Sequence, residues 1–339
     1  MNAALPRRPL GRSGLTVSTL GFGAAPLGDL YGRLDDQTAI DAVTAALSAG
    51  VSLIDAAPLY GHGLAEHRVG TAIRRFERSQ IQLSTKIGRY MDPGRGRGDG
   101  SGYHGGQPHA AVIDYSRDGT LRSVEQSLLR LGTDRIDILL IHDVDVWTHG
   151  KDGFEQRYRE AMAGAYPALH QLRAEGVVKA IGIGVNEADV CARFARAGDF
   201  DTMLLAGRYS LLEQPALDEF LPLALEKGIG VMLGGVFNSG ILATGPIPGA
   251  KYNYRDAPPE ILAKVGRIQR VCADHGADLA TAALQFALGH PAVSSIVLGA
   301  TSPQEVERNL AGLTTPIAPA LWSNLKAEGL LRKEAPVPL

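Results

Sequence analysis

The sequence has little cysteine and no spacing that suits a metal. Only two cysteines occur in 339 residues, Cys191 and Cys272, and each lies in a stretch with helical spacing of apolar residues. They form no C-x-x-C pair, and the nine histidines form neither an H-x-H nor an H-E-x-x-H motif. These absences argue against a disulfide framework and against a zinc site. We therefore expect buried, reduced thiols in a cytoplasmic protein that holds no metal.

An excess of charge of one sign and long apolar runs are also missing. The chain has 34 Lys and Arg against 36 Asp and Glu, for a formal net charge of −2. Such a balance offers no broad basic surface to nucleic acid or to an anionic membrane. No uninterrupted apolar run approaches the roughly 20 residues of a membrane span, and residues 1–8 lack the apolar core of a secretory signal. We expect neither nucleic acid nor membrane as a partner, and the oligomeric state stays open.

A dinucleotide-binding G-x-G-x-x-G motif is absent as well, since Gly21 and Gly23 make too short a match. What the chain does contain is a strand-then-helix alternation. The predicted strands are 19–23, 51–55, 81–86, 135–143, 177–184, 201–205, 230–233 and 293–298. Eight such units favour a single-domain (β/α)8 TIM barrel over residues 1–339 rather than a doubly wound sheet. Residues 7–17 predict an N-terminal β-hairpin that caps the barrel, and residues 319–330 predict an extra C-terminal helix.

The segment 88–118 has no periodicity and includes a glycine-rich run at 93–102. Loops of this length inside a compact domain are usually functional or disordered. Because the segment follows the predicted strand that carries Lys86, we interpret it as a lid over the active site. The alternative is a solvated, mobile insertion.

Polar side chains follow three consecutive predicted strands at the point where each strand ends. Asp55 ends the second strand, with Tyr60 five residues later, Lys86 ends the third, and His142 ends the fourth. Active sites of TIM barrels lie at the C-terminal ends of the strands. Each residue alone has a plain structural explanation, such as a cap or a packed turn. Their joint placement predicts one catalytic cluster.

The chemistry of this cluster suits proton transfer. Asp55 and Lys86 can form a buried ion pair, and an ammonium beside a phenol is expected to lower the pKa of Tyr60 from about 10. Tyr60 would then act as general acid for reduction of a carbonyl or as general base for oxidation of an alcohol. His142 would hydrogen-bond the substrate oxygen and fix its orientation.

These motifs resemble the aldo-keto reductase family. The family's Asp, Tyr, Lys and His are matched by Asp55 and Tyr60 in DAAPLYG, Lys86 in STK, and His142 in LLIHD. Further matches are GLTVS at 14–18, SLLRLG at 127–132 and GATSP at 299–303. The resemblance covers essentially the whole chain. It implies a (β/α)8 barrel that binds NAD(P)H across its C-terminal face.

The resemblance also suggests residues around the nicotinamide and the pyrophosphate. Asn186 is the candidate for the carboxamide, with the N-cap of the following helix as the alternative. Tyr209 is an option for stacking on the nicotinamide, with a packed core tyrosine as the alternative. Glycines in the loop after the seventh strand would let the backbone approach the pyrophosphate. The candidates in this loop are Gly234, Gly235, Phe237 and Gly240.

The adenosine end predicts a preference for NAD. Members of the family that prefer NADP place Lys and Arg around the 2′-phosphate, where this chain has Gly299 and Glu305. A carboxylate repels a phosphate and can accept from a ribose hydroxyl instead. Arg308 lies one turn further on and would permit NADP. The remaining candidates here are Thr301 and Asn309.

Within the family, the chain is similar to aldose 1-dehydrogenases, in GVNE at 184–187, AGRYSLL at 206–212 and GGVFNSG at 234–240. This implies NAD(P)-dependent oxidation of a free aldose at C1 to the lactone, with L-fucose, D-arabinose and L-galactose as examples. The alternatives are a pyridoxal 4-dehydrogenase, an NADPH-dependent aldehyde or ketone reductase, and a nucleotide-sensing barrel without catalysis. Candidate residues for a sugar substrate are Asp143, Trp147 and His62. Their alternative is a solvated acidic loop with a packed tryptophan.

Overall fold

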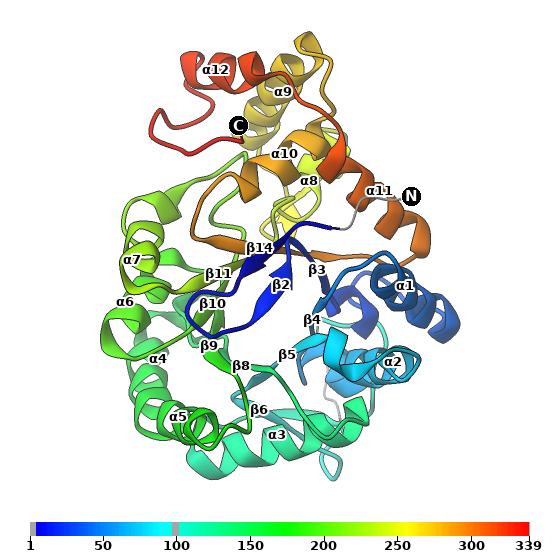
Figure 1. The fold of residues 1–339 in the computed structure, drawn as a ribbon, viewed down its shortest axis with the longest axis vertical. Coiled ribbons are helices and arrows are strands. Elements are labelled where there is room, and N and C mark those ends of the chain that lie inside the picture. Colours follow the sequence, from blue (N-terminus) through cyan, green and yellow to red (C-terminus); the bar gives the residue numbers. More distant parts are fainter. Residues whose placement is uncertain (1–4, 97–101, 339) are drawn as a thin grey trace.

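A closed barrel of parallel strands forms the centre of the molecule (Figure 1). The computed structural model describes residues 5–96 and 102–338, and within them eight strands close in the order β3-β4-β5-β8-β9-β10-β11-β14. Their bounds are β3 Leu20–Gly23, β4 Leu53–Asp55, β5 Gln82–Ile87, β8 Ile138–His142, β9 Ala180–Val185, β10 Thr202–Ala206, β11 Gly230–Gly234 and β14 Val293–Gly299. The predicted TIM barrel is confirmed, with strand boundaries within about three residues of those expected.

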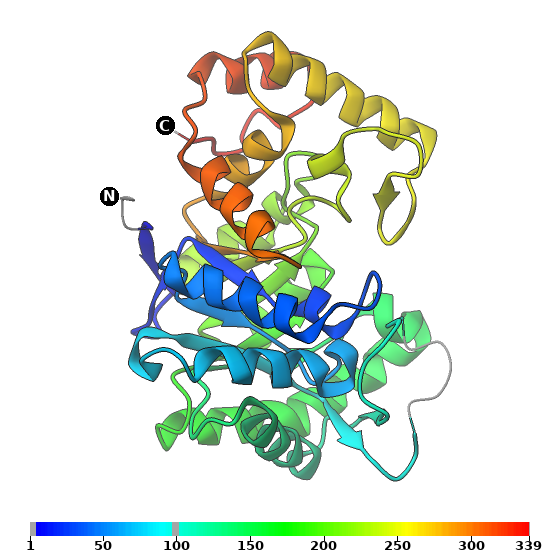
Figure 2. The same cartoon turned by 90° about the vertical axis from the view of Figure 1, so that its right-hand side faces the viewer.

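Helices surround the strands, and the last part of the chain adds helices beside the barrel (Figures 1 and 2). The surrounding helices are α1 Asp36–Ser48, α2 Leu64–Ile73, α3 Arg117–Leu131, α4 Val146–Glu160, α5 Tyr166–Ala174, α6 Ala188–Ala197, α7 Phe220–Lys227, α10 Leu279–Leu288 and α11 Pro303–Thr314. The additional ones are the short α8 Ile241–Thr244, then α9 Pro259–Asp274 and α12 Pro319–Ala327. Helices α9 and α12 pack against each other at one side of the barrel.

The N-terminal hairpin closes the bottom of the barrel, as predicted. Strand β1 (Arg7–Pro9) pairs antiparallel with β2 (Thr16–Ser18). Leu10 and Val17 join the buried cluster that fills the barrel interior. Gly11 has a φ of +53°, and a Cβ there would lie 2.3 Å from the Gly230 backbone nitrogen. Only glycine permits this close approach of the hairpin turn to the start of β11.

Replacing Leu10 by alanine tests the hairpin as a closing element. Leu10 is fully buried, so the Leu10→Ala variant should lower the free energy of unfolding by about 2–5 kcal/mol, through lost burial and the cavity left behind. Leu129→Ala is the matched control, because Leu129 is 82% exposed and should change stability by less than about 0.5 kcal/mol. Urea unfolding of both variants measures the difference, and equal stability would show that the hairpin merely rests on the barrel.

The structure corrects the prediction of a polar loop after the fourth strand. Residues Val146–Glu160 form helix α4, which continues through a π-helical turn (Ala161–Ala165) into α5. Asp145 caps the helix by accepting a hydrogen bond from the Thr148 backbone N–H. The helix is hard to recognise in the sequence because Phe154 is its only buried side chain in the described structure. Without an apolar face, helical periodicity gives no signal.

The segment 88–118 contains more structure than the sequence indicates. Strand β6 (Arg89–Asp92) pairs antiparallel with β7 (Ala110–Ile113), whereas residues 97–101 lie outside the described part. The return of the segment contacts two loops at the C-terminal end of the barrel: the backbone N–H of His104 donates to the Asp29 carbonyl, and that of Gln107 to the Gly61 carbonyl. Figure 2 shows the β6–β7 hairpin on the same side of the barrel as a second hairpin, β12 (Lys251–Tyr252) and β13 (Arg255–Asp256). These strands have only two to four residues. They are too short for an alternation of apolar and polar side chains to indicate them in the sequence.

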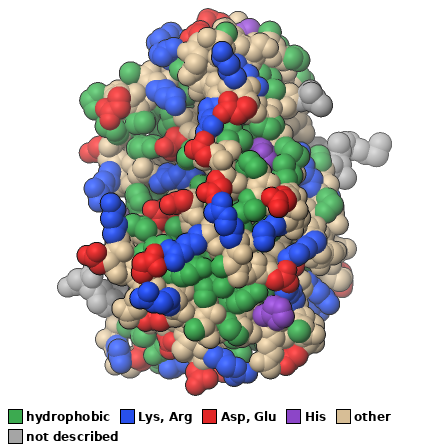
Figure 3. Space-filling model, turned by 90° about the vertical axis from the view of Figure 1, so that its left-hand side faces the viewer, with side chains coloured by type: hydrophobic (Ala, Val, Ile, Leu, Met, Phe, Trp, Pro, Cys, Tyr) green, Lys and Arg blue, Asp and Glu red, His purple; other side chains and the backbone are tan. Residues whose placement is uncertain are grey.

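Charges of both signs are interspersed on the face drawn in Figure 3, where Lys, Arg, Asp and Glu side chains alternate without a large patch of either sign. No helix in the described ranges combines the length and apolar character that a membrane span requires. Cys191 and Cys272 are free and buried, and burial raises the pKa of the Cys272 thiol to about 12. The expectation of buried, unpaired thiols is confirmed.

Candidate active site

The four residues of the predicted cluster lie at the C-terminal mouth of the barrel. Asp55 is the last residue of β4 and His142 the last of β8, while Lys86 is next to the end of β5. Strand β5 pairs with both β4 and β8, so the three strand ends are adjacent. Tyr60 begins a short 3-10 turn (Tyr60–Gly63) five residues after Asp55. The structure therefore brings together the four residues that the polar ends of the predicted strands indicated as one cluster.

Asp55 and Lys86 form the expected buried ion pair. Lys86 Nζ lies 2.7 Å from Asp55 Oδ2, and both side chains are at most 3% exposed. The same ammonium donates to the Ala56 carbonyl at 2.8 Å, and the Ser84 hydroxyl donates to Asp55 Oδ1 at 2.7 Å. Further hydrogen bonds to both charges are what a desolvated pair needs in order to persist.

The rings of Tyr60 and His142 pack beside this pair. Lys86 Nζ lies 4.8 Å from the centroid of the Tyr60 ring. The Tyr60 and His142 rings meet edge to face, with centroids 5.9 Å apart. A titratable hydroxyl, an imidazole and an ammonium thus share one buried site, the combination that proton transfer to or from a substrate oxygen requires.

The expected effect of Lys86 on Tyr60 is wrong. The pKa of Tyr60 lies well above its usual value, because burial disfavours the phenolate and because the Asp55 and Asp143 carboxylates repel it. Lys86 is committed to the Asp55 carboxylate and to a backbone carbonyl. Its positive charge is therefore largely balanced, and Tyr60 stays a neutral phenol at pH 7.

His142 is neutral as well. Burial lowers its pKa well below the usual value, and the positive charges of Lys86 and Arg89 lower it further. The His142 main-chain carbonyl accepts a hydrogen bond from the Tyr115 hydroxyl at 2.9 Å. Tyr115 lies between β7 and α3, and this hydrogen bond holds the backbone of His142 in place. A neutral imidazole can exchange hydrogen bonds with a substrate oxygen without adding charge.

His62 holds a neighbouring loop, which corrects its candidacy as a substrate residue. It is 3% exposed and has a φ of +55°. Its Nδ1 lies 2.7 Å from the His109 carbonyl, and its ring meets that of Tyr103 edge to face. Both partners belong to the segment that returns across the mouth. Tyr103 is a residue that the sequence reasoning missed, since nothing in an aperiodic stretch singles it out.

Asn186 and Trp147 line a small pocket at the mouth, together with residues after β10 and β11. The Asn186 backbone N–H donates to Asp145 Oδ2 at 3.1 Å, and its side-chain amide lies 3.5 Å from the same oxygen. The N-cap of α6 is Glu187, so the alternative for Asn186 as a helix cap is wrong. Trp147 is 48% exposed, and the Arg208 guanidinium lies 6.0 Å from its ring centroid.

Tyr209 does not face the mouth, which corrects its candidacy for stacking. Its side chain is 1% exposed and packs against Phe286 and His290, with ring centroids 5.1 and 5.6 Å away. Both partners belong to α10 and the turn that follows it. The packed tyrosine, which was the alternative, is therefore what the structure contains.

The loop after β11 has the backbone of an anion-binding cradle. Four residues between Gly235 and Gly240 have positive φ: Gly235, Asn238, Ser239 and Gly240. A Cβ on Gly240 would meet no atom within 4 Å, so its backbone is open to a ligand. The buried Asn238 side chain fixes the loop by accepting from the Ser210 hydroxyl at 2.5 Å and donating to Glu213 at 3.0 Å. Phe237 is half-buried against the core. Such a loop fits a pyrophosphate approached by backbone N–H groups.

The loop after the adjacent strand β14 leads into the N-terminus of α11. Ser302 caps this helix, and Glu305 accepts hydrogen bonds from the Thr301 backbone N–H at 2.7 Å and from its hydroxyl at 3.0 Å. This arrangement is close to a capping box. Arg308 is exposed and lies 3.9 Å from Glu305. Gly299 packs against Pro26, and Asn309 borders a narrow apolar crevice by β3. A helix N-terminus beside the glycine-rich loop suits the phosphates of a dinucleotide.

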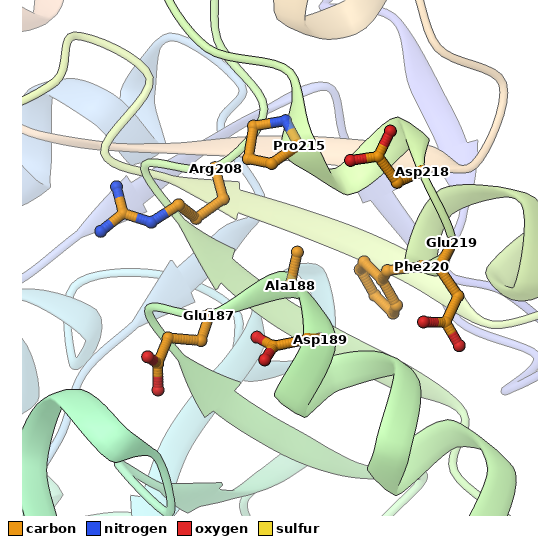
Figure 4. A pocket seen from close by; sticks show the side chains of 8 residues that line it. All are labelled: Glu187, Ala188, Asp189, Arg208, Pro215, Asp218, Glu219 and Phe220. Atoms are coloured by element: carbon orange, nitrogen blue, oxygen red, sulfur yellow. The ribbon is translucent and has the colours of Figure 1, made fainter. Parts of the chain in front are cut away.

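A second pocket lies between the start of α6 and the start of α7 and shares Arg208 with the first pocket (Figure 4). Its volume is about 340 Å³. It is lined by Glu187, Ala188, Asp189, Arg208, Pro215, Asp218, Glu219 and Phe220. Figure 4 shows the Arg208 guanidinium directed away from Asp218 and Glu219. In the described ranges, no three His, Cys, Asp or Glu side chains are grouped to hold a metal ion.

Comparison with known proteins gives consistent matches over nearly the whole chain. Residues 19–327 match the model of the Aldo/keto reductase family. Pyridoxal 4-dehydrogenase of Microbacterium luteolum is 41% identical over 97% of this chain and 98% of that protein. D-threo-aldose 1-dehydrogenase of a Pseudomonas species is 38% identical over 94% of this chain and 96% of that protein. Among solved structures, the holo form of an aldo-keto reductase from Bacillus halodurans superposes with a TM-score of 0.75 at 26% identity, covering 98% of both chains.

Proposed function

Because the chain belongs to the aldo/keto reductase family and is an NAD(P)-dependent oxidoreductase, we propose that it oxidises the hemiacetal carbon of a free aldose to a lactone with NAD⁺. The observation that carries the proposal is the buried cluster of Tyr60, His142 and the Asp55–Lys86 pair at the barrel mouth. A phenol, a neutral imidazole and a balanced ion pair supply the proton transfer that interconverts an alcohol and a carbonyl.

Each residue of the cluster has a separate task in this reaction. In its phenolate form Tyr60 takes the proton of the anomeric hydroxyl during oxidation, and in its phenol form it donates that proton during reduction. His142, held neutral, hydrogen-bonds the same oxygen and fixes its direction. The Asp55–Lys86 pair provides a fixed dipole beside the developing charge at no cost of reorganisation. The bound nicotinamide dinucleotide supplies the acceptor of the hydride.

Free aldoses and pyridoxal share the reacting group that this site would meet. A free aldose closes into a ring whose C1 is a hemiacetal carbon, and the aldehyde of pyridoxal closes on its neighbouring hydroxymethyl group in the same way. Oxidation of either hemiacetal gives a lactone. Pyridoxal is therefore the second candidate, favoured by the 41% identity to a pyridoxal 4-dehydrogenase against 38% to an aldose 1-dehydrogenase.

Initial rates on a substrate panel test this proposal. L-fucose, D-arabinose, L-galactose and pyridoxal are each supplied with NAD⁺ and with NADP⁺, and a simple aldehyde is supplied with NADH and NADPH. We expect turnover of at least one sugar, and higher kcat/KM with NAD⁺ than with NADP⁺. Turnover of pyridoxal alone would select the second candidate. Turnover of only the aldehyde with NADPH would rule out both the aldose and pyridoxal as substrates.

The preference for NAD rests on the charge beside the α11 N-terminus. Glu305 is held in place by Thr301, so its carboxylate stays where a 2′-phosphate would be repelled. Arg308 is exposed and separated from Glu305 by 3.9 Å, which makes it a weak counterweight. Faster turnover with NADP⁺ than with NAD⁺ would show that the attraction of Arg308 for the 2′-phosphate outweighs the repulsion by Glu305.

We further propose that residues 102–109 cover the substrate. This stretch is attached to the loops after β3 and β4 by its backbone hydrogen bonds to Asp29 and Gly61. His62 adds a contact to the His109 carbonyl. A cover of this kind excludes water from the reacting carbon.

The raised pKa of Tyr60 makes the two directions respond differently to pH. Oxidation needs the phenolate, so kcat/KM with sugar and NAD⁺ should rise about tenfold per pH unit while the pH is below the Tyr60 pKa. Reduction needs the phenol, so kcat/KM with an aldehyde and NADH should stay level over the same range. Steady-state rates between pH 6 and 9 measure both slopes. An oxidation rate that falls as the pH rises would contradict the assignment of Tyr60 as the base.

A further inference from the structure

A second buried charge pair lies directly beside the catalytic cluster. Arg89 is the first residue of β6 and only 6% exposed. Its Nη1 lies 3.0 Å from Asp143 Oδ2. Asp143 follows His142 in the chain, and its other carboxylate oxygen lies 3.4 Å from His142 Nε2. The pair thus adjoins the imidazole that faces the reacting oxygen.

Local structure directs both side chains to this place. Gly88 has a φ of +96°, and a Cβ there would lie 2.4 Å from the Tyr115 ring, so only glycine allows β5 to turn into β6 under this ring. The Arg89 carbonyl accepts from the Ser123 hydroxyl at 2.9 Å, which fixes the start of β6. Asp143 has a φ of +52°, and its carbonyl lies 3.3 Å from the Tyr115 hydroxyl. Tyr115 therefore supports both residues of the pair.

Comparison with another buried arginine shows that the bonding of Arg89 is incomplete. Arg68, which is 5% exposed, donates to the Leu27 and Leu34 carbonyls and pairs with Asp29 and Asp36. Arg89 is buried to the same degree, yet its Nη1 has only the ion-pair contact with Asp143 among the described residues, and that contact lacks hydrogen-bond geometry. A guanidinium carries five N–H donors, and each buried donor without a well-aligned acceptor is costly. A purely structural role would be expected to resemble that of Arg68.

The pair also lies close to Tyr60. The Asp143 carboxylate raises the pKa of Tyr60 and the Arg89 guanidinium lowers it. Asp143 is the more accessible partner, with 17% of its side chain exposed against 6% for Arg89. A substrate oriented by Tyr60 and His142 would therefore bring the atoms next to its reacting carbon to this pair.

We propose that Arg89 and Asp143 form a subsite for an oxygen substituent on the carbon next to the reacting carbon. Arg89 donates to that oxygen, and Asp143 accepts from it when it is a hydroxyl. The inference rests on the proposed function, because it assigns the substrate class of the same site: compounds oxygenated beside the hemiacetal or carbonyl carbon. An aldehyde without that oxygen leaves the subsite unused.

Two aldehydes that differ by a single hydroxyl test the subsite directly. Lactaldehyde and propanal have the same carbon chain, and only lactaldehyde carries a hydroxyl next to the carbonyl carbon. The wild type should reduce lactaldehyde with NADH at a higher kcat/KM than propanal. In Arg89→Met this preference should fall by roughly 10- to 100-fold, as expected for loss of a hydrogen bond to a charged group. Because the Arg89 charge also acts on Tyr60 and His142, both rates can change in this variant, and the measured quantity is the ratio of the two kcat/KM values.

Matched variants separate recognition from folding. Arg95 lies on the same hairpin but is 69% exposed, so Arg95→Met should leave both rates unchanged. Asp143→Asn keeps the shape of the side chain and tolerates the positive φ. It should lower the lactaldehyde preference in the same direction as Arg89→Met, and it serves as the test if Arg89→Met does not fold.

Three outcomes would overturn the subsite: a wild type without preference for lactaldehyde, equal losses on both aldehydes in Arg89→Met, or an Arg89→Met variant that keeps its preference. Equal losses would show that Arg89 acts only by positioning His142. Failure of the proposed function is distinguishable, because it appears as absent turnover of L-fucose and pyridoxal with NAD⁺ while the lactaldehyde preference of the wild type persists.

Discussion

The Tyr60→Phe variant should bind NAD⁺ and NADH as the wild type does and lose turnover by about 10²–10⁴-fold. The ring of Tyr60 packs against His142 and under Lys86, and phenylalanine preserves these contacts. The variant removes only the hydroxyl, and with it the group that accepts the substrate proton. Cofactor binding by fluorescence titration and initial rates with sugar and NAD⁺ measure the two quantities separately.

Tyr90→Phe is the control for loss of a tyrosine hydroxyl near the site. Tyr90 lies on β6, and the Arg122 guanidinium stacks over its ring at 3.9 Å, a contact that phenylalanine keeps. This variant should retain wild-type turnover. Sugar oxidation by Tyr60→Phe within a few-fold of the wild-type rate would show that another group takes the proton.

The Lys86→Met variant should lose stability as well as turnover. Removing the ammonium leaves the Asp55 carboxylate buried without its counter-charge, which typically costs about 3–5 kcal/mol. Urea unfolding measures the stability, and initial rates measure the turnover.

A double variant distinguishes the structural from the catalytic share of this pair. Asp55→Leu combined with Lys86→Met removes both charges and fills the space with apolar side chains, which is often neutral or stabilising for a buried pair. We expect the double variant to recover most of the lost stability but none of the turnover. Recovered turnover would show that the pair only maintains the fold.

The barrel and its catalytic cluster were predictable because local patterns determine them. Each strand is a short apolar run, and in a parallel barrel the polar residue at its end must lie at the mouth. Adjacent strands in the chain are adjacent in the barrel, so Asp55, Lys86 and His142 had to converge. The position of Tyr60 depends on the conformation of the loop after Asp55, which the strand pattern does not indicate. The resemblance to the family predicted the role of Tyr60 instead.

Features that depend on packing between distant segments were not predictable. The orientation of Tyr209 is decided by Phe286 on α10 and by His290 in the turn after it, some 80 residues away in sequence. The pKa of Tyr60 is decided by burial, which outweighs a nearby ammonium that is already paired.

Arg89 was missed in the sequence because it follows a glycine in an aperiodic stretch. Its position next to Asp143 arises from the turn at Gly88 and from the Tyr115 ring that packs on it. The signal that could have found it is an arginine three residues after the catalytic lysine, at the entry to a loop.

The most direct test of the account is the product formed from L-fucose and NAD⁺ by the wild type and by Tyr60→Phe. We expect the wild type to form the lactone and NADH in equal amounts, and Tyr60→Phe to form neither at a comparable rate. The account would be contradicted if the wild type formed no lactone from L-fucose, any other aldose or pyridoxal while reducing simple aldehydes with NADPH.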